Sequence, residues 1–248
     1  MAIITLLTDF GQSDSYVAEV KAVLLSQAGS VALVDITHQI APGNVAEGQY
    51  LLGRSWRRFP QGTVHLAVVD PGVGTDRRAI AAEAEGHLFV APDNGILSFL
   101  PPPPGAGFVL LRVPPDASPT FQARDVFAPA AARLARGASL LELGPRIADP
   151  YRSPLPTVRS DGVALVGAVI HVDRFGTLVT NIPGERVEPG VRILIEDVDC
   201  GPLRRTFGDV ERGKLVAYIG SDGLVEVAVR DGNAARQLGV GVGTGVRA

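Results

Sequence analysis

An aspartate and an arginine lie seven positions apart in a glycine-rich segment of the chain, Asp70-Pro71-Gly72-Val73-Gly74-Thr75-Asp76-Arg77. The segment follows an apolar run but lacks the third glycine and the following helix of a dinucleotide-binding loop. A carboxylate and a guanidinium on the two sides of a tight turn can face one another and polarise a water molecule. The alternative is an ion pair that only stabilises the loop, and the segment alone leaves both interpretations open.

A second acid, Asp9, directly follows the apolar opening run in Thr8-Asp9-Phe10-Gly11. In an α/β fold, ligands bind at the carboxyl ends of the strands, and a carboxylate can accept hydrogen bonds from both hydroxyls of a ribose. Asp9 is therefore a candidate ribose ligand, with the alternative that it caps the turn into the next helix. The triplet Asp-Phe-Gly does not indicate a kinase, because neither a His-Arg-Asp loop nor a glycine-rich phosphate loop accompanies it.

Two more clusters contain charged side chains. Arg124 and Asp125 begin a helical pattern, and we expect them to tie down the helix start rather than act on a substrate. Asp173 stands close to Phe175 after an apolar run. An acid beside an aromatic ring suits a ligand with an amino group and a flat ring, whereas the alternative is an ordinary β-turn with a packed phenylalanine.

Apolar runs and helical periodicity predict the elements that must position these residues. We expect buried strands at 2–7, 31–35, 64–69, 79–84, 88–91 and 108–113, and helices at 15–28, 45–57 and 125–136. In the first helix Val20 and Leu24 belong to the apolar stripe, and Asp14 and Ser15 are the expected caps. Strands that alternate with helices predict a mostly parallel sheet covered by helices.

The pattern changes after a segment without periodicity at 151–161, which we interpret as a linker. Beyond it, short strands are expected at 163–172, 191–196, 214–219 and 224–230, separated by Gly, Pro and Asp turns. The sequence thus predicts the α/β fold class with two domains: an N-terminal α/β domain at 1–150 with a mostly parallel central sheet, and a small β-barrel-like C-terminal domain at 162–248.

Bulk composition excludes several classes of protein. The 23 Lys and Arg residues against 26 Asp and Glu give a net charge of -3 with the signs interspersed, so we expect no nucleic-acid partner. Cys200 is the only cysteine and the four histidines lack metal-ligand spacing, so we expect no internal disulfide and no metal site. The opening residues lack the basic lead of a signal peptide and no apolar run is long enough to span a membrane, which predicts a cytoplasmic protein without a membrane partner.

Taken together, several segments resemble the S-adenosyl-L-methionine (SAM) hydroxide adenosyltransferase family, also called SAM hydrolases, which is related to the SAM-dependent fluorinase and chlorinase. The matching segments in chain order are residues 7–11, 34–38, 69–75, 91–95, 173–176, 180–182 and 223–228. Each segment alone is a weak signal, but an ordered set over nearly the whole chain is specific.

The resemblance implies that SAM and water react at the ribose 5′ carbon to give adenosine and L-methionine, which are then the partners of the protein. It also implies a homotrimer in which each active site lies between the first domain of one subunit and the second domain of its neighbour. No cofactor or metal is expected, because the sulfonium substrate brings its own leaving group. The protein has only to place and activate the water.

The resemblance also assigns roles by position. Asp70 and Arg77 match the first two members of an Asp-Arg-His triad that is associated with producing the attacking hydroxide. The expected substrate-binding residues are Asp9 for the ribose, Asp14, Asp173 and Ser221 for the methionine amino and carboxylate groups, Phe175 and Phe207 for the adenine, and Glu226 and Val229 for closing that pocket.

Two positions depart from the family pattern. Gln122 stands in place of the triad histidine, and Thr177 stands where an adenine-contacting Asn is usual. We take Gln122 as a candidate catalytic residue with Asp70 and Arg77, and Thr177 as a candidate substrate-binding residue. Glutamine can orient a water but cannot take its proton at neutral pH.

Three alternative functions follow from these residues. The first, prompted by Gln122, is a SAM- or adenosine-binding protein with weak or lost catalysis. The second is a SAM-dependent halogenase, but those relatives carry Tyr at position 70, and the charge of Asp70 would repel a halide. The third is a methyltransferase, which would need a glycine-rich SAM loop after its first strand that residues 8–13 do not supply.

Overall fold

The computed structural model describes residues 1–153, 156–162 and 164–248, and the chain divides into two compact units, Met1–Pro154 and Leu155–Ala248. Part of the expected linker, at 154–155, and the first residue of the expected strand at 163–172 lie outside the described residues. Among the residues described, no helix has the length and apolar character needed to cross a bilayer.

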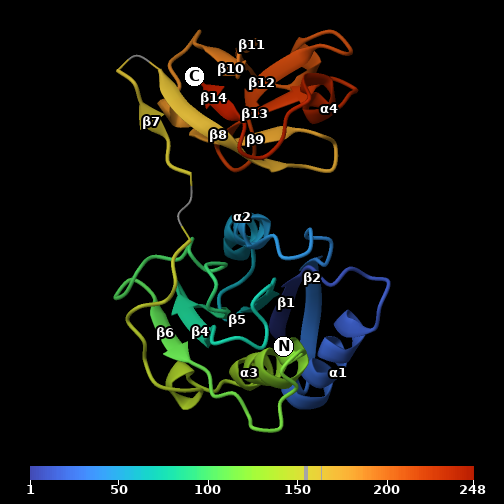
Figure 1. Ribbon diagram of the computed structural model, residues 1–248, viewed down its shortest axis with the longest axis vertical. Helices are drawn as coiled ribbons and strands as arrows, with labels where there is room; N and C mark the ends of the chain where they lie inside the picture. Colours follow the sequence, from blue (N-terminus) through green and yellow to red (C-terminus); the bar gives the residue numbers. More distant parts are fainter. Residues whose placement is uncertain (154–155, 163) are drawn as a thin grey trace. The chain divides into compact units, whose positions relative to one another are not determined.

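The first unit is built on a six-stranded sheet with the order β2-β1-β3-β5-β4-β6 over the described residues (Figure 1). Its strands are β1 (Ala2–Thr8), β2 (Val31–Thr37), β3 (Val64–Val68), β4 (Ala79–Ala84), β5 (His87–Pro92) and β6 (Gly107–Leu110). β1 pairs with β2 and β3 in parallel, and β3 pairs with β5 in parallel. These pairings confirm the mostly parallel sheet.

β4 is the exception, because it runs antiparallel to both β5 and β6. Only Glu85 and Gly86 separate β4 from β5, and both have positive φ, 50° and 78°. A two-residue connection of this kind forces a hairpin, since a parallel crossover needs a much longer segment. The edge of the sheet therefore departs from the parallel pattern for a local reason.

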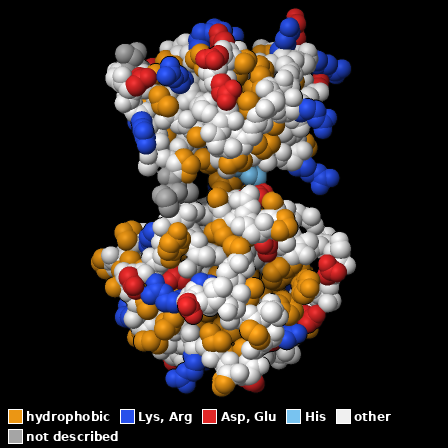
Figure 2. All heavy atoms as spheres, viewed as in Figure 1, with side chains coloured by type: hydrophobic (Ala, Val, Ile, Leu, Met, Phe, Trp, Pro, Cys, Tyr) orange, Lys and Arg blue, Asp and Glu red, His pale blue; other side chains and the backbone are white. Residues whose placement is uncertain are grey.

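Helices cover both faces of this sheet (Figure 1). α1 (Tyr16–Ala28) and α3 (Ala128–Ala135) pack on the face that holds Ile4 and Leu6 of β1, and α2 (Val45–Ser55) packs on the opposite face, which holds Leu7. Successive residues of a strand point to opposite faces, so one apolar run supplies both cores. The face of this unit shown in Figure 2 carries interspersed acidic and basic side chains with hydrophobic side chains between them.

Two helix starts differ from the expected ones. Ser15 stands at the N-cap of α1 but in a helical conformation, φ -77° and ψ -9°, so it makes no side-chain cap bond and its hydroxyl donates to Glu19 instead. The prediction that Asp14 and Ser15 cap this helix is therefore wrong, since a cap needs extended backbone. The expected helix at 125–136 starts earlier, as a π-helical turn at Ala123–Phe127 before α3, where Pro129 occupies the first turn.

The second unit is a closed β-barrel, which confirms the predicted barrel-like fold. Its strands are β7 (Arg159–Ser160), β8 (Leu165–Val172), β9 (Leu178–Pro183), β10 (Arg192–Ile195), β11 (Val198–Arg204), β12 (Leu215–Ile219), β13 (Leu224–Val229) and β14 (Gly245–Arg247). Over the described residues the order is β14-β10-β11-β12-β13-β9-β8-β7, and β14 also pairs with β8, which closes the ring. A short helix, α4 (Ala234–Leu238), packs on the barrel core.

The sequence pattern missed the short strands β7 and β14 and the longer strands β9 and β11. β11 contains Gly201, with φ +83°, and Pro202, two residues that weaken a strand pattern. β9 follows the turn at Asp173 so closely that its first residues read as part of that turn. β9 and β11 form because their neighbours in the barrel supply backbone partners.

Candidate active site

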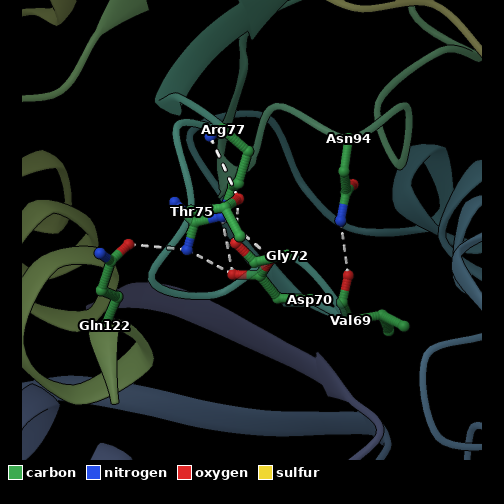
Figure 3. Close-up of polar contacts among 7 residues, drawn as sticks. All are labelled: Val69, Asp70, Gly72, Thr75, Arg77, Asn94 and Gln122. Carbon is green, nitrogen blue, oxygen red and sulfur yellow. Dashed lines mark hydrogen bonds and ion pairs between the residues drawn. The ribbon is translucent and has the colours of Figure 1, made fainter. Parts of the chain in front are cut away.

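Asp70, Arg77 and Gln122 form one hydrogen-bonded group beyond the carboxyl end of β3 (Figure 3). Arg77 Nε donates to both carboxylate oxygens of Asp70 at 2.9 Å, and Arg77 Nη2 donates to Asp70 Oδ2 and, at 2.6 Å, to Gln122 Oε1. The Asp70 and Arg77 side chains are only 5% and 10% exposed. The structure thus brings the three candidate catalytic residues together, and their side chains are largely shielded from solvent.

Local contacts explain why the turn between Asp70 and Arg77 folds back on itself. The Thr75 hydroxyl donates to the carbonyl of Gly72 at 2.7 Å, and the turn passes through Gly74 with φ +78°. A Cβ atom on Gly74 would lie 2.9 Å from the carbonyl oxygen of Pro119, so only glycine lets the two loops approach this closely. Asn94 Nδ2 donates to the Val69 carbonyl at 2.7 Å and fixes the end of the strand before Asp70 (Figure 3).

A separate set of ion pairs holds the segment that carries Gln122. Arg124 donates to both oxygens of Asp125 at 2.7 and 3.1 Å and to Glu19 on α1 at 2.9 Å, and Asp125 also accepts from the Ser118 backbone at 2.9 Å. The hydrogen bond with Arg124 lowers the pKa of Asp125, and that with Asp125 raises the pKa of Arg124. Arg124 and Asp125 tie down the helix start, as predicted.

An open cleft lies beside this group. The residues that line it are Asp9, Phe10, Tyr16, Val68, Asp70, Val73, Thr120, Phe121, Gln122 and Ala123. Asp9 Oδ2 accepts a hydrogen bond from the Gly43 backbone at 2.8 Å. Asp14 is exposed and is not among the lining residues, so within this unit the structure groups Asp9, but not Asp14, with Asp70 and Gln122.

Three aromatic rings of the cleft wall were missed by the sequence reasoning. Phe10, Tyr16 and Phe121 are in mutual contact, with ring centroids 5.3 to 6.1 Å apart. The available signal was that Phe10 directly follows Asp9 and Phe121 directly precedes Gln122 in the sequence, whereas no such neighbour marks Tyr16. A wall of this kind offers apolar surface to a ligand whose polar groups reach Asp9 and Asp70.

In the second unit Asp173 organises a turn between β8 and β9. Its Oδ1 accepts from the backbone of Phe175 at 2.9 Å and of Thr177 at 2.8 Å, and the turn passes through Gly176 with φ +83°. Phe175 is 76% exposed. The alternative of a packed phenylalanine is therefore wrong, because the ring projects from the turn, whereas Thr177 is buried.

Phe207 stands on the same unit and is 46% exposed. Its ring lies edge-on to that of Tyr218 with centroids 4.7 Å apart, and the Tyr218 hydroxyl donates to Glu226 Oε2 at 2.8 Å. Burial and the hydrogen bond with Glu226 raise the pKa of Tyr218, so the phenol stays a donor. Tyr218 is a further residue that the sequence reasoning missed, since it reads as an ordinary strand residue of β12.

Ser221 and Val229 differ in where their side chains lie. Ser221 is exposed in the turn between β12 and β13. Val229 is 6% exposed and packs in the barrel core, and its carbonyl accepts from the Gly232 backbone at 3.1 Å. The side chain of Val229 therefore faces the barrel interior rather than its surface.

Both units of the chain match models of one protein family. Residues 4–144 match the model of the SAM hydroxide adenosyltransferase N-terminal domain, and residues 167–247 match that of the C-terminal domain. This chain belongs to the SAM hydroxide adenosyltransferase family. The two family domains correspond to the α/β unit and the β-barrel unit described above.

Relatives within the family carry two kinds of name. A Thermus thermophilus protein named (R)-S-adenosyl-L-methionine hydrolase is 43% identical over 97% of each chain, and one of the same name from Salinispora tropica is 40% identical over 98% of this chain and 96% of its own. A fluorinase from an Actinoplanes species is 31% identical over 91% of this chain and 90% of its own. A solved structure of an uncharacterized conserved protein from Thermotoga maritima aligns with a TM-score of 0.92 at 34% identity and covers 98% of each chain.

Proposed function

We propose that this protein hydrolyses S-adenosyl-L-methionine at the ribose 5′ carbon to adenosine and L-methionine. The observation that carries the proposal is the buried Asp70–Arg77–Gln122 group at the wall of a cleft that also contains Asp9. Membership of the SAM hydroxide adenosyltransferase family and the names of the relatives at 40% and 43% identity support the same reaction.

The chemistry is a single displacement. A water oxygen forms a bond to the 5′ carbon while the bond from that carbon to sulfur breaks, and the electron pair of the broken bond goes to sulfur. Methionine leaves as a neutral thioether, and the water loses one proton as it becomes the 5′ hydroxyl of adenosine. Because the sulfonium is already a good leaving group, we propose that the reaction needs no cofactor, and that placement of the water supplies most of the rate.

Asp70 is the proposed proton acceptor. Its Oδ1 accepts only the Nε hydrogen bond of Arg77 among the described residues, and a carboxylate oxygen can accept more than one. Gln122 has the different role of orienting the water. Its Oε1 already accepts from Arg77, so its amide NH2 is the group left to donate to the water oxygen. Arg77 holds both side chains in place.

The remaining candidates bind the substrate in this proposal. Asp9 holds the ribose, and carboxylates near the cationic substrate offset the cost of removing its charges from water. The proposed methionine binders are Asp14, Asp173 and Ser221, and the proposed adenine-pocket residues are Phe175, Thr177, Phe207, Glu226 and Val229. We also propose a cytoplasmic homotrimer with its sites shared between subunits, which the exposed rings of Phe175 and Phe207 support.

The direct test incubates the purified protein with SAM in water enriched in oxygen-18 and separates the products by chromatography. We expect adenosine and methionine in equal amounts, with the label in the adenosine 5′ hydroxyl. Absence of adenosine, together with calorimetric binding of SAM, would show a binding protein instead. Halogenated adenosine formed in fluoride or chloride buffer would overturn hydrolysis in favour of halogenation.

A further inference from the structure

A buried threonine and a buried histidine lie directly behind the turn that carries Asp9. Thr8 is the last residue of β1, His38 follows β2, and each is 2% exposed. Thr8 Oγ1 lies 2.8 Å from His38 Nδ1. Neither residue lines the cleft, so neither is placed to touch a ligand there.

The other ring nitrogen of His38 faces a carboxylate. His38 Nε2 is 3.2 Å from Asp35 Oδ1, within ion-pair distance although without the geometry of a hydrogen bond. Asp35 also accepts from Lys21 Nζ at 2.6 Å. Burial alone would raise the pKa of Asp35, but the contacts with Lys21 and His38 outweigh it and lower the pKa, which keeps Asp35 ionised.

This arrangement assigns the direction of the hydrogen bond between Thr8 and His38. A carboxylate only accepts, so the proton of a neutral imidazole belongs on Nε2, opposite Asp35. Nδ1 of His38 is then an acceptor, and the Thr8 hydroxyl donates to it. With its proton committed to His38, Thr8 Oγ1 presents a lone pair to the Phe10 backbone N–H, 3.3 Å away.

The turn from Thr8 to Gly11 is consequently held at both ends by His38. The side chain of His38 fixes Thr8, and the carbonyl of His38 accepts from the Gly11 backbone at 2.8 Å. Asp9 lies between these two anchors, and its own carboxylate accepts from Gly43, five residues beyond His38 in the same loop. One loop between β2 and α2 thereby sets both the backbone and the carboxylate of Asp9.

We propose that Thr8 and His38 are positioning residues that hold the Asp9 carboxylate in the orientation needed to accept both hydroxyls of the ribose. The inference rests on the proposed function, since Asp9 has a ribose to bind only if the cleft takes a nucleoside. It goes beyond that function by naming Thr8 and His38 as the residues through which the site selects a ribose with its 2′ and 3′ hydroxyls over one without them.

The same strand offers a matched control. Thr5 of β1 is fully buried, and its Oγ1 lies 2.8 Å from Nδ1 of the equally buried His65. The buried threonine–histidine contact has the same length as that of Thr8 and His38, although His65 Nε2 faces His87 Nδ1 at 3.1 Å rather than a carboxylate. Neither Thr5 nor His65 lines the cleft. Thr5→Val therefore reports the cost of breaking a buried threonine–histidine hydrogen bond without disturbing Asp9.

The experiment measures binding of adenosine and of 2′,3′-dideoxyadenosine to the full-length protein by calorimetry. We expect the native protein to prefer adenosine, and Thr8→Val to bind adenosine about tenfold more weakly while binding of the dideoxy compound changes little. Thr8→Ser, which keeps the hydroxyl, should restore the preference. Thr5→Val should keep it, although it loses thermal stability as Thr8→Val does.

Two results would overturn the inference: an unchanged preference in Thr8→Val, or an equal loss of affinity for both nucleosides. If Thr8→Val does not fold, His38→Asn and His38→Leu make the same comparison, because only Asn retains an acceptor near the Nδ1 position. Binding requires no turnover, so failure of the native protein to form adenosine from SAM would count against the proposed function and leave this measurement intact.

Discussion

The two compact units expose their candidate site residues to very different degrees. In the α/β unit, the side chains of Asp70 and Arg77 are 5% and 10% exposed and are bonded to one another before any substrate arrives. In the barrel unit, Phe175 is 76% exposed and Phe207 is 46% exposed.

The difference follows from what each group would do. Charged groups that activate a water act most strongly in a fixed geometry shielded from solvent, so they must be paired in the folded protein. Aromatic rings that stack on a base need only a flat apolar face, which gains contact area when a ligand covers it. We therefore expect substitutions in the Asp70–Arg77–Gln122 group to change turnover and substitutions of the exposed rings of Phe175 and Phe207 to change affinity.

The largest expected effect comes from Asp70→Asn, which keeps the shape of the side chain but removes the proton acceptor. The turnover number should fall about a thousandfold, with a much smaller change in the affinity for SAM. Steady-state kinetics with adenosine detection would measure both. The matched control is Asp93→Asn, because Asp93 is also buried and bound to an arginine, Arg78 at 2.7 Å, but does not line the cleft. Equal losses in the two variants would contradict a chemical role for Asp70.

Phe175→Ala should have the next largest effect and should appear in binding. Loss of a base-stacking ring is expected to weaken SAM binding by about thirtyfold and to leave the turnover number nearly unchanged. The melting temperature should stay constant, since a ring that is 76% exposed contributes little to the fold. If Phe175→Ala has normal affinity for SAM and reduced turnover, the expected role of Phe175 in binding is contradicted.

Gln122→His tests how much turnover is lost because glutamine stands in place of the triad histidine. The one unprotonated nitrogen of a neutral imidazole can accept a proton from water, which the glutamine amide cannot do, so we expect the turnover number to rise about tenfold at pH 7.5. The increase should fade as the pH falls and the imidazole becomes protonated. A pH profile of turnover for the native protein and the variant would measure this, and identical profiles would show that Asp70 already supplies the whole effect.

The smallest expected effect concerns acid stability of the α/β unit. Burial, followed by the charge of His87, lowers the pKa of His65 from 6.5 to about 3. The folded state thus excludes a proton that the unfolded state binds, so the free energy of unfolding should fall as the pH drops below 6.5 and go on falling toward 3. Between pH 7 and 5.5 the loss should be about 1 kcal/mol greater than in His65→Asn, which cannot titrate.

Urea unfolding followed by tryptophan fluorescence would measure this difference, because Trp56 is the single tryptophan and lies in the same unit, 5.0 Å from the His87 ring. Phe175→Ala, in the other unit, should leave the pH dependence unchanged. Parallel pH dependence in the native protein and His65→Asn would contradict the prediction.

Local sequence was sufficient for the features that depend on near neighbours. The two-fold and 3.6-fold apolar periods predicted most strands and helices of the first unit, and the glycine turn placed Asp70 and Arg77 close enough to pair. Ser15 does not form the expected side-chain cap, because its backbone is helical rather than extended. The local pattern also missed β9 and β11, which owe their structure to strand partners elsewhere in the barrel.

The sequence by itself therefore determined the α/β and barrel units and the acidic turns that end their strands. Only the tertiary structure decided that Gln122 accepts a hydrogen bond from Arg77 across 45 positions, that His38 stands behind Thr8 across 30, and that Phe175 projects while the side chain of Val229 is buried. The physical reason is that hydrogen bonds and burial depend on which groups meet in space, and for residues this far apart that is set by the packing of whole elements rather than by any local pattern.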